Sequence, residues 1–543
     1  MQLDLTLVGK ILASPRRLRV LAAIQEGVVT PKMISTKLNM HTSHVSKALR
    51  ELERLGLVEC NTPDLRKGRI FSVTTCGNQI MQTVKSIQGS QESRYPLAEK
   101  SVLQLKNMSE LLLPPGYELL PATNQLYELQ LAMGELNILE PEDLIKRGAY
   151  FYKVQGKETY HYQLCTGAPL LLDKRTSMRL RTFFQAYQFK TGYATHGLFP
   201  YRGKFHPQMI KAIMNIIGVM EGDTVLDPMT GCGTVNIEAS IVGINSIGVE
   251  MNPFCCLMSE AKIRALELDS QELRQSEKDP HLIFDRYHKD KEQVLSRKHD
   301  EEGLCDLNET VERLFKLAYL DALGFARRRA NKEPRELFPI VLEKYVSAVT
   351  NFLLIKQKLD LKIGKATIVH GDCRDLTHLK IGDKTGIADE SIDGIITSPP
   401  YSFAIDYLEG DKSQLDYMGY KIDELRKNMI GLRGRCLPDK VLNYIKDMDR
   451  AVGEMARVLK KNKYCVIVIG SNIIQLEHTL QIAAEQNSQE ILREFEKSAR
   501  LEDALVRIGE RHGLTLEARL SHPIEGIRNI MRSEELLFLR KAF

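Results

Sequence analysis

The chain lacks any apolar run that approaches the roughly 18 to 20 residues needed to span a lipid bilayer. Its N-terminal stretch is interrupted by Asp4 and has no small-residue cleavage site, so it does not have the form of a secretory signal peptide. These absences argue against both a membrane protein and a secreted one. They predict a cytoplasmic location and no membrane partner.

Sequence motifs that bind metal ions are missing as well. The ten cysteines are scattered, with no CxxC pair and no neighbouring histidine cluster. This arrangement disfavours a structural zinc site, and in a cytoplasmic protein it also disfavours disulfides. We therefore expect no metal ion.

The chain also has little net charge, because 75 basic side chains stand against 70 acidic ones and leave a formal charge of +5. No global basic field marks a nucleic-acid partner, so any phosphate-binding surface must be local. The 543 residues, 43% of them apolar, are too many for a single hydrophobic core. The length predicts three or four domains.

Residues 1–88 carry the pattern of three short helices followed by a β-rich pair. A proline stands in the first turn of an amphipathic helix, Thr30-Pro31 start a second helix, and Thr42 can cap a third. Two β-rich segments joined by a polar, basic tip then follow and end at residue 73. This order resembles a winged helix-turn-helix domain.

The third helix and the tip would present polar and basic side chains to DNA. Groups of this kind on the helix suit a major groove, and cations on the tip suit phosphates. The candidate DNA-binding residues are Ser43, His44, Lys47, Arg50, Arg66 and Lys67. A protein-interaction module is the alternative, because the winged-helix fold is reused for that purpose.

The chain changes character twice after the N-terminal domain. Residues 89–190 are interpreted as a linker and an uncharacterised α+β region. From residue 191 onward, strands, glycine-rich turns and helices alternate, which indicates a doubly wound α/β sheet. The expected strands are 224–226, 246–250, 366–370, 393–397, 464–469, 514–520 and 535–539. A charged, mostly helical stretch at about 265–360 is interpreted as an insertion.

The segment 224–234 has the features of a nucleoside-binding turn. Gly231 and Gly233 let the backbone approach a bulky ligand, and Asp227 ends a buried strand at the crevice where open α/β sheets bind ligands. The spacing matches neither GxGxxG nor a phosphate-binding P-loop. An ordinary tight turn is the alternative for this segment alone.

Two further acidic residues follow strands of the same expected sheet. Glu250 can accept hydrogen bonds from both ribose hydroxyls, and Asp372 can accept one from an adenine amine. Each carboxylate alone would be interpreted as a solvated strand end or a helix cap. Three of them at successive strand ends favour a nucleoside cofactor.

The fourth expected strand ends in Ser398-Pro399-Pro400-Tyr401. The prolines fix the backbone dihedral φ and lack amide protons, so the Pro399 carbonyl is held outward as an acceptor. This carbonyl and the Ser398 hydroxyl can accept both protons of an exocyclic amine and direct the nitrogen lone pair toward a methyl sulfonium. Tyr401 offers a flat face on which an extruded base can stack. A proline-rich turn with a buried tyrosine is the alternative for the tetrapeptide in isolation.

Together these motifs resemble those of the DNA amino-methyltransferases, which modify cytosine N4 or adenine N6, and the resemblance covers residues 195–543. It implies a Rossmann-like methyltransferase sheet and S-adenosyl-L-methionine as the cofactor. The implied cofactor-binding residues are Phe205, Asp227, Pro228, Gly231, Gly233, Thr234, Glu250 and Asp372, and the implied catalytic residues are Ser398, Pro399, Pro400 and Tyr401. Serine at the first tetrapeptide position is typical of cytosine-N4 enzymes, whereas Asp or Asn is typical of adenine-N6 enzymes.

The resemblance therefore implies a site-specific DNA methyltransferase that acts on cytosine N4, with an N-terminal winged-helix domain and a helical insertion. Two features depart from the family pattern: Met229 stands where phenylalanine is usual, and the insertion falls where one helix and a loop are expected. Methylation of RNA or of adenine in DNA is one alternative. A winged-helix transcription regulator that only senses the cofactor is another. Whether a cognate restriction endonuclease accompanies the protein stays open.

The stretch after Tyr401 is interpreted as a substrate-facing lid with basic residues for phosphates, and a solvated surface helix is the alternative. Its basic residues are Lys412, Arg426, Lys427, Arg433 and Arg435. The late segment 522–528 is expected either as a loop near the same face or as the turn of a terminal β-hairpin.

Overall fold

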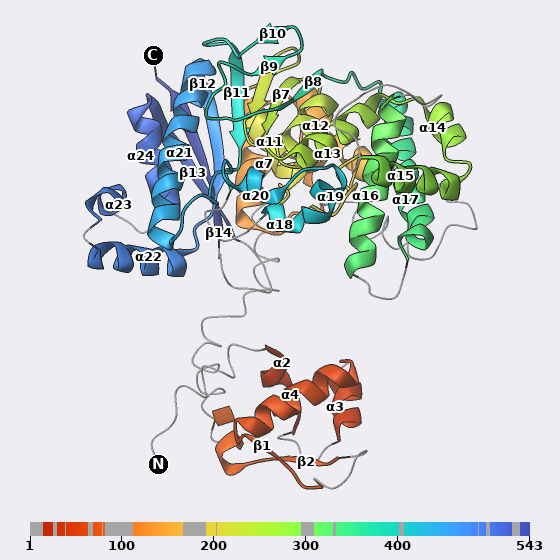
Figure 1. The fold of residues 1–543 in the computed structure, drawn as a ribbon, viewed down its shortest axis with the longest axis vertical. Coiled ribbons are helices and arrows are strands. Elements are labelled where there is room, and N and C mark those ends of the chain that lie inside the picture. The colour runs from red at the N-terminus through yellow and green to blue at the C-terminus, as the bar shows by residue number, and fades with distance from the viewer. Residues whose placement is uncertain are drawn as a thin grey trace. The chain divides into compact units, whose positions relative to one another are not determined.

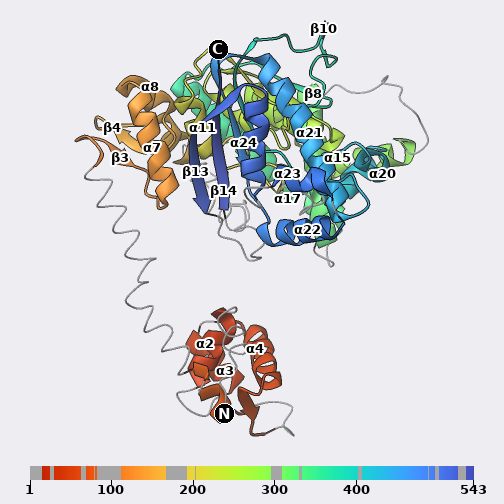
Figure 2. The same cartoon turned by 90° about the vertical axis from the view of Figure 1, so that its left-hand side faces the viewer.

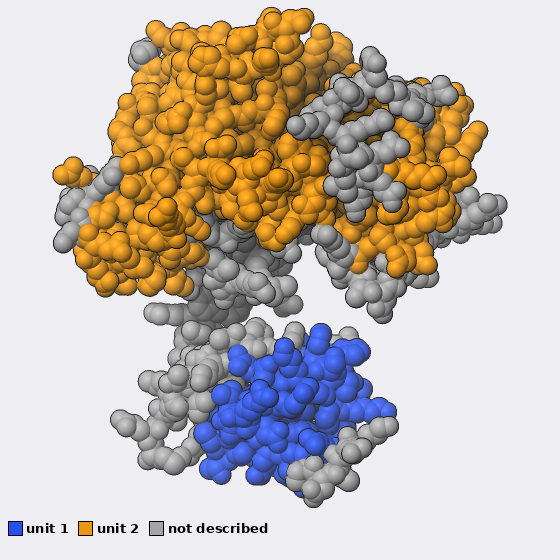
Figure 3. All heavy atoms as spheres, viewed as in Figure 1, with its two compact units in different colours: residues 1–108 blue, residues 109–543 orange. Residues whose placement is uncertain are grey.

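The computed structural model of the chain describes the greater part of its residues. These are 15–24, 30–38, 40–62, 69–78, 80–81, 112–166, 192–201, 203–294, 309–328, 333–400, 407–486, 488–495, 500–523 and 533–542. Contacts divide the chain into two units, residues 1–108 and residues 109–543 (Figure 3).

The first unit contains helices and a small antiparallel sheet (Figures 1 and 2). Its elements are α2 (Pro15–Ile24), α3 (Pro31–Leu38), α4 (Thr42–Arg54), β1 (Val58–Cys60) and β2 (Phe71–Val73). The apolar positions of α4 recur at helical spacing, so Val45, Leu49 and Leu52 are all buried in the core of this unit. The elements follow the order predicted from the sequence, and the winged-helix assignment itself stays a prediction.

The second unit is built around a seven-stranded sheet with the order β13-β14-β12-β11-β6-β7-β8. The strands are β6 (Thr224–Asp227), β7 (Asn245–Glu250), β8 (Ala366–His370), β11 (Ile392–Thr397), β12 (Leu459–Ile469), β13 (Leu514–Pro523) and β14 (Ser533–Lys541). The five strands β12, β11, β6, β7 and β8 pair in parallel with their neighbours. Strand β14 pairs antiparallel with both β12 and β13. All seven expected strands form. This is the expected Rossmann-like methyltransferase sheet.

Helices cover both faces of this sheet because its central strands are apolar on both sides. In β12, Cys465 and Ile467 pack with α21 (Leu437–Val458) and α24 (Leu501–Arg511), whereas Val466 and Val468 pack on the opposite face. That opposite face is covered by α11 (Pro207–Ile216), α12 (Thr234–Ile241) and α7 (Leu126–Ile138). The alternation follows the two-residue period of a strand.

The region before the sheet belongs to the same unit. It contains β3 (Glu118–Leu119), α7, α8 (Pro141–Arg147), β4 (Phe151–Val154), β5 (Lys157–Glu158) and α9 (Tyr160–Thr166). Buried Glu135 on α7 accepts hydrogen bonds from the Asn215 side chain of α11 at 2.7 Å and from the Ala149 amide at 2.9 Å. The described part of the 89–190 region is thus packed against α11 and the seven-stranded sheet.

The stretch expected to be a helical insertion is helical, and it connects β7 to β8 at one side of the sheet (Figure 1). Its helices are α13 (Pro253–Arg264), η1 (Ala265–Glu267), α14 (Ser270–Ser276), α15 (Pro280–Val294), α16 (Glu309–Arg328) and α17 (Pro334–Leu359). By length and composition, α17 could cross a membrane. In this structure its Phe338, Tyr345 and Phe352 side chains are buried in the protein core.

The remaining elements lie beyond β8. They are β9 (Lys380–Ile381), β10 (Lys384–Thr385), α18 (Tyr407–Gly410), α19 (Lys412–Tyr417), α20 (Ile422–Arg426), α22 (Ile473–Glu485) and α23 (Gln489–Glu494). Strands β13 and β14 are consecutive and antiparallel, with His522 opposite Glu534. Of the predicted 522–528 loop, residues 524–528 lie outside the described part of the chain.

Candidate cofactor and catalytic site

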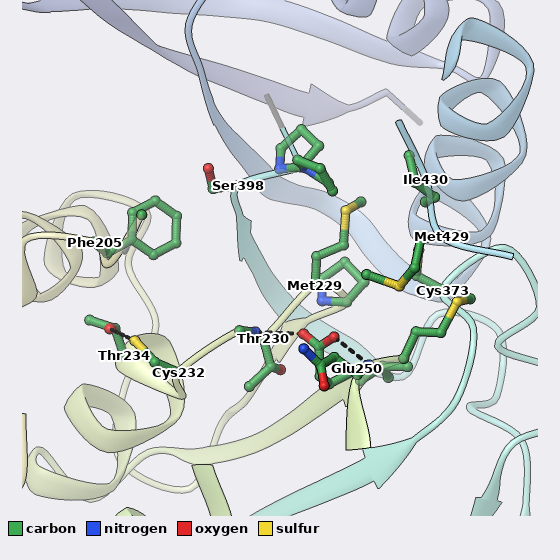
Figure 4. Close-up of a pocket in the computed structure, with 18 of the residues that line it drawn as sticks. Phe205, Met229, Thr230, Cys232, Thr234, Glu250, Cys373, Ser398, Met429 and Ile430 are labelled. Carbon is green, nitrogen blue, oxygen red and sulfur yellow. Dashed lines mark hydrogen bonds between the residues drawn. The ribbon is translucent and has the colours of Figure 1, made fainter. Parts of the chain in front are cut away.

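A pocket of about 920 Å³, including its open mouth, lies at the carboxyl ends of β6, β7, β8 and β11 (Figure 4). The chain runs outward from β6 to β7 and β8 and then returns to β11 on the other side of β6, so β6 and β11 form the topological switch point where such sheets bind ligands. The pocket is lined by Tyr201, Gly203, Phe205, Pro228 to Cys232, Thr234, Val249 to Asn252, Gly371, Cys373, Ser398 to Pro400, Met429 and Ile430.

The glycine turn has a shape that only glycine adopts easily. Gly231 has a φ of 54° and Gly233 has a φ of 80°, both in the left-handed region. A Cβ atom on Gly233 would lie 3.0 Å from the Cβ of Ser259 on α13. The Ser259 hydroxyl donates a 2.8 Å hydrogen bond to the Gly231 carbonyl. The turn is therefore held tightly against α13, and α12 begins directly after it, beside the pocket.

Glu250 lies where the sequence predicts the ribose-binding acid. Its carboxylate accepts hydrogen bonds from the backbone amides of Gly231 and Asn252, both at 2.8 Å. Burial raises the pKa of Glu250, while these amide donors lower it. A carboxylate has about four lone-pair positions, so two remain for the hydroxyls of a ribose.

Asp227 lies behind the pocket wall rather than in it, because it is only 1% exposed and its neighbour Pro228 lines the cavity. Its Oδ1 accepts hydrogen bonds from the Met229 amide at 3.1 Å and from the Thr397 hydroxyl at 2.8 Å. Burial raises the pKa of Asp227 to about 7. Since Thr397 directly precedes Ser398, Asp227 joins the glycine turn to the end of β11.

The third acid, Asp372, does not line the pocket, although its neighbours Gly371 and Cys373 do. Arg374 donates to both carboxylate oxygens of Asp372, from Nε at 2.9 and 3.0 Å and from Nη2 at 2.6 Å. In this structure the carboxylate is thus committed to an arginine two residues away. The sequence pattern of acids at strand ends could not show that Arg374 competes with adenine for this carboxylate.

The loop that carries Phe205 is fixed by a buried carboxylate on α12. Glu238 accepts hydrogen bonds from the Tyr193 hydroxyl and pairs with His196 Nε2, both at 2.6 Å, and Lys211 Nζ lies 3.3 Å from it. Burial alone would raise the pKa of Glu238, but Lys211 and His196 lower it to about 2. The ionised carboxylate therefore anchors the loop. Sequence reasoning missed Glu238 because it has the pattern of an ordinary helix residue.

Three residues of the predicted catalytic tetrapeptide lie at the same pocket. Ser398, Pro399 and Pro400 follow the fully buried strand β11 and line the cavity. Tyr401 lies outside the described residues. In Figure 4, Phe205 lies on the opposite side of the pocket from Met429 and Ile430. Sequence reasoning also missed Met429 and Ile430, which carry no motif of their own.

The candidate DNA-binding side chains divide into two groups. Ser43, His44, Lys47 and Arg50 are exposed on α4, away from its buried face. Arg66 and Lys67 lie outside the described residues. Among the described residues, no group of three or more His, Cys, Asp or Glu side chains could hold a metal ion.

The basic residues predicted for a lid are engaged in different ways. Arg433 pairs with buried Asp447, and Arg426 lies 3.3 Å from Asp423 and 3.7 Å from Glu409. The other three, Lys412, Lys427 and Arg435, are exposed. At least Arg433 therefore serves the fold, which the distribution of charge along the sequence does not reveal.

Comparison with known proteins supports a cofactor for this pocket. Residues 198–296 match the family model described as RMKL-like, methyltransferase domain. The chain is 31% identical over 142 residues to the type II methyltransferase M.MjaII of Methanocaldococcus jannaschii, covering 25% of this chain and 24% of that protein. It is 25% identical over 291 residues to the type II methyltransferase M.BsoBI of Geobacillus stearothermophilus, covering 45% of this chain and 57% of that protein.

A third relative is the tRNA (guanine(10)-N2)-dimethyltransferase of Methanothermobacter thermautotrophicus, 35% identical over 54 residues, which are 10% of this chain and 16% of that protein. The chain thus spans less than two thirds of the length of each of these relatives. The family model and all three relatives are described as methyltransferases, and the cofactor is S-adenosylmethionine.

The pocket fits S-adenosylmethionine on its own geometry. The left-handed glycines leave space beside the backbone. Glu250, at the carboxyl end of β7, offers acceptors to a ribose in the pocket. Buried Asp227 Oδ2 has no hydrogen-bond partner among the described residues. A buried carboxylate oxygen without a partner disfavours the charged form, which agrees with the raised pKa of Asp227 behind the pocket wall.

Replacing Glu250 by alanine is expected to weaken S-adenosylmethionine binding by about 1.5–3 kcal/mol, because two hydrogen bonds to ribose are removed. Isothermal titration calorimetry measures this directly. Glu250→Gln keeps one acceptor oxygen and should weaken binding less. Unchanged affinity of the alanine variant would remove Glu250 from the site.

Proposed function

We propose that this protein transfers a methyl group from S-adenosylmethionine to the exocyclic N4 amine of cytosine in DNA, at specific sites. One observation carries the proposal: Ser398 and Pro399 line the same pocket as the glycine turn and Glu250. The motif that would orient an amine is therefore beside the place where the cofactor binds. A protein that only senses the cofactor has no need of this acceptor pair.

The chain's own residues would act by orienting the substrate amine. When bound, S-adenosylmethionine supplies an electrophilic methyl group on a sulfonium. The Ser398 hydroxyl and the Pro399 carbonyl each accept a hydrogen bond from the amine, which directs the nitrogen lone pair toward that methyl group. The nitrogen releases one proton as it gains the methyl group, and Ser398, which is partly exposed at the pocket, can pass this proton to water.

The strand end is held in place for this task. Thr397 donates its 2.8 Å hydrogen bond to Asp227, and β11 pairs with β6 and β12 on its two sides. Because all six residues of β11 are buried, the position of Ser398 is set by the core rather than by a surface loop. Such pre-organisation favours a reaction that depends on the direction of a lone pair.

The product identifies the function. The purified protein, DNA and S-adenosylmethionine with a labelled methyl group should yield N4-methylcytosine, detected by mass spectrometry of the hydrolysed nucleosides. Methyl groups found only on adenine would overturn the base assignment, and methyl groups found only on added tRNA would overturn DNA as the substrate. Absence of transfer to any nucleic acid would favour the regulator that senses the cofactor.

We further propose that unit 1 binds the DNA duplex through α4. Its exposed Ser43, His44, Lys47 and Arg50 share the side of the helix that faces away from the core. An exposed helix with small polar and basic groups suits the major groove, and the cations among them suit phosphates.

Removing residues 1–108 is expected to weaken DNA binding and to flatten its dependence on salt, by about 0.9 in the log–log slope for each phosphate that unit 1 neutralises. Fluorescence anisotropy at several salt concentrations measures both. Binding of S-adenosylmethionine by residues 109–543 serves as the control and should persist. An identical salt slope in the truncated protein would assign unit 1 to protein interaction instead.

A further inference from the structure

A short segment between α20 and α21 forms one wall of the cofactor pocket. Met429 and Ile430 line the cavity there, and Figure 4 shows them beside Cys373. This segment lies more than 170 residues after Glu250 in the sequence and has no strand that ties it to the sheet. Its position depends on the packing of Ile430 in the core beside α21 and on side-chain hydrogen bonds to neighbouring elements.

Arg374 makes the bond that lies next to this wall. Its Nη2 donates a 2.8 Å hydrogen bond to the carbonyl of Asn428, the residue directly before Met429. The same guanidinium holds Asp372 at the end of β8 and, through Nη1 at 2.7 Å, Asp447 on α21. Its side chain is only 6% exposed. One buried group thus joins the sheet, α21 and the pocket wall.

A second attachment lies on the other side of Met429 and Ile430. Arg433 donates from Nε to Asp447 Oδ2 at 3.2 Å and also pairs with Oδ1 of that carboxylate. The Arg433 carbonyl accepts a 3.2 Å hydrogen bond from the Asn443 side chain of α21. Asp447 is 2% exposed and binds both arginines. The wall is therefore fastened at both ends to the same buried carboxylate.

We propose that Arg374 is a positioning residue for cofactor binding, which holds Met429 and Ile430 against bound S-adenosylmethionine. Asp372 supports this role by accepting hydrogen bonds from the Arg374 guanidinium on both carboxylate oxygens. The planar guanidinium suits this role because its five donors can serve two carboxylates and a carbonyl at once. A lysine keeps the charge but cannot hold all three acceptors in that geometry. This inference rests on the cofactor assignment and is independent of the DNA substrate.

The chain offers a matched control for this proposal. Arg457 also binds two carboxylates, Glu454 and Asp389, and one backbone carbonyl, that of Ile387. Unlike Arg374, it makes no hydrogen bond, within the described residues, to the segment that carries Met429 and Ile430. Arg457 and Asp389 are more exposed than Arg374 and Asp447, so the stability of each variant is measured by thermal unfolding, and cofactor binding is compared between folded proteins.

The test compares Arg374→Lys with Arg457→Lys, using S-adenosylhomocysteine as the probe in titration calorimetry on the full chain. We expect the dissociation constant to rise about tenfold or more in Arg374→Lys, because several charge-assisted bonds are broken together, and to stay near the wild-type value in Arg457→Lys. Arg433→Gln, which releases the other end of the wall, should shift it in the same direction. Equal affinities in wild type, Arg374→Lys and Arg433→Gln would overturn the proposal.

Limited trypsin digestion gives a second measurement that does not depend on activity. Lys427 is exposed directly before the wall, so release of the wall should speed cleavage after Lys427 in Arg374→Lys, as followed by mass spectrometry. S-adenosylhomocysteine should protect the wild type. Equal cleavage rates in both lysine variants would contradict the proposal. A wild-type protein that did not bind S-adenosylhomocysteine would overturn the cofactor assignment together with it.

Discussion

Replacing Tyr401 by alanine is expected to lower turnover about 5- to 150-fold while leaving S-adenosylmethionine affinity nearly unchanged. The range corresponds to the loss of about 1–3 kcal/mol from base stacking on an aromatic ring. Tyr401 directly follows the described pocket residues Pro399 and Pro400, so its ring is the first aromatic face after the proposed amine acceptors. Single-turnover methyl transfer to DNA, combined with calorimetry, separates the two quantities.

The control is Tyr401→Phe, which keeps the ring and removes only the hydroxyl. It should retain most of the rate if stacking is the role of this residue. A phenylalanine variant as slow as the alanine variant would assign the effect to the hydroxyl, and an alanine variant as fast as wild type would remove Tyr401 from the mechanism. Ser398→Ala should differ from both, because it deletes an acceptor and not a stacking surface.

Substitution of Gly233 by alanine is the second change for which we expect a large effect. The φ of 80° places alanine in the left-handed region at a penalty of about 1–2 kcal/mol. In addition, the new Cβ would meet the Ser259 Cβ at 3.0 Å, so the turn must move away from α13. Since this turn also lines the pocket through Gly231 and Cys232, S-adenosylmethionine affinity should fall at least about tenfold.

Gly218 provides the comparison, because it has a similar φ of 71° and an added Cβ there would meet nothing within 4 Å. Gly218→Ala should carry the backbone penalty alone and should bind the cofactor like wild type. Thermal unfolding with and without S-adenosylhomocysteine measures both effects. If the two variants were equally stable and bound the cofactor equally well, the contact with Ser259 would have no role in shaping the turn.

The sequence predicts the parts of this site that depend on local pattern. The glycine turn, Glu250 and the Ser398 tetrapeptide each follow a strand whose apolar run is visible in the sequence, and the sheet brings the ends of those strands together. Parallel strands place their carboxyl ends at one edge, so three separate motifs can be assigned to one pocket without any knowledge of distances.

The parts that could not be predicted depend on pairs distant in the chain or on competition between partners. Arg374 and Asp447 are separated by 73 positions, and nothing in either neighbourhood indicates the other. The place of Asp372 at a strand end fits a role at adenine, but an arginine two residues later binds it. Met429 and Ile430 are ordinary apolar residues whose role arises from the bonds that hold their segment in place.

The place of the helices between β7 and β8 has a consequence for the sheet. Strand β8 forms the edge of the sheet and pairs only with β7 in that sheet, so the connection between them can lengthen without breaking any strand pairing. Doubling the length of a flexible connection adds only about 0.6 kcal/mol of closure entropy. An insertion at this crossover therefore leaves the parallel pairing of β6, β7 and β11 intact, and the pocket at their carboxyl ends keeps its strands.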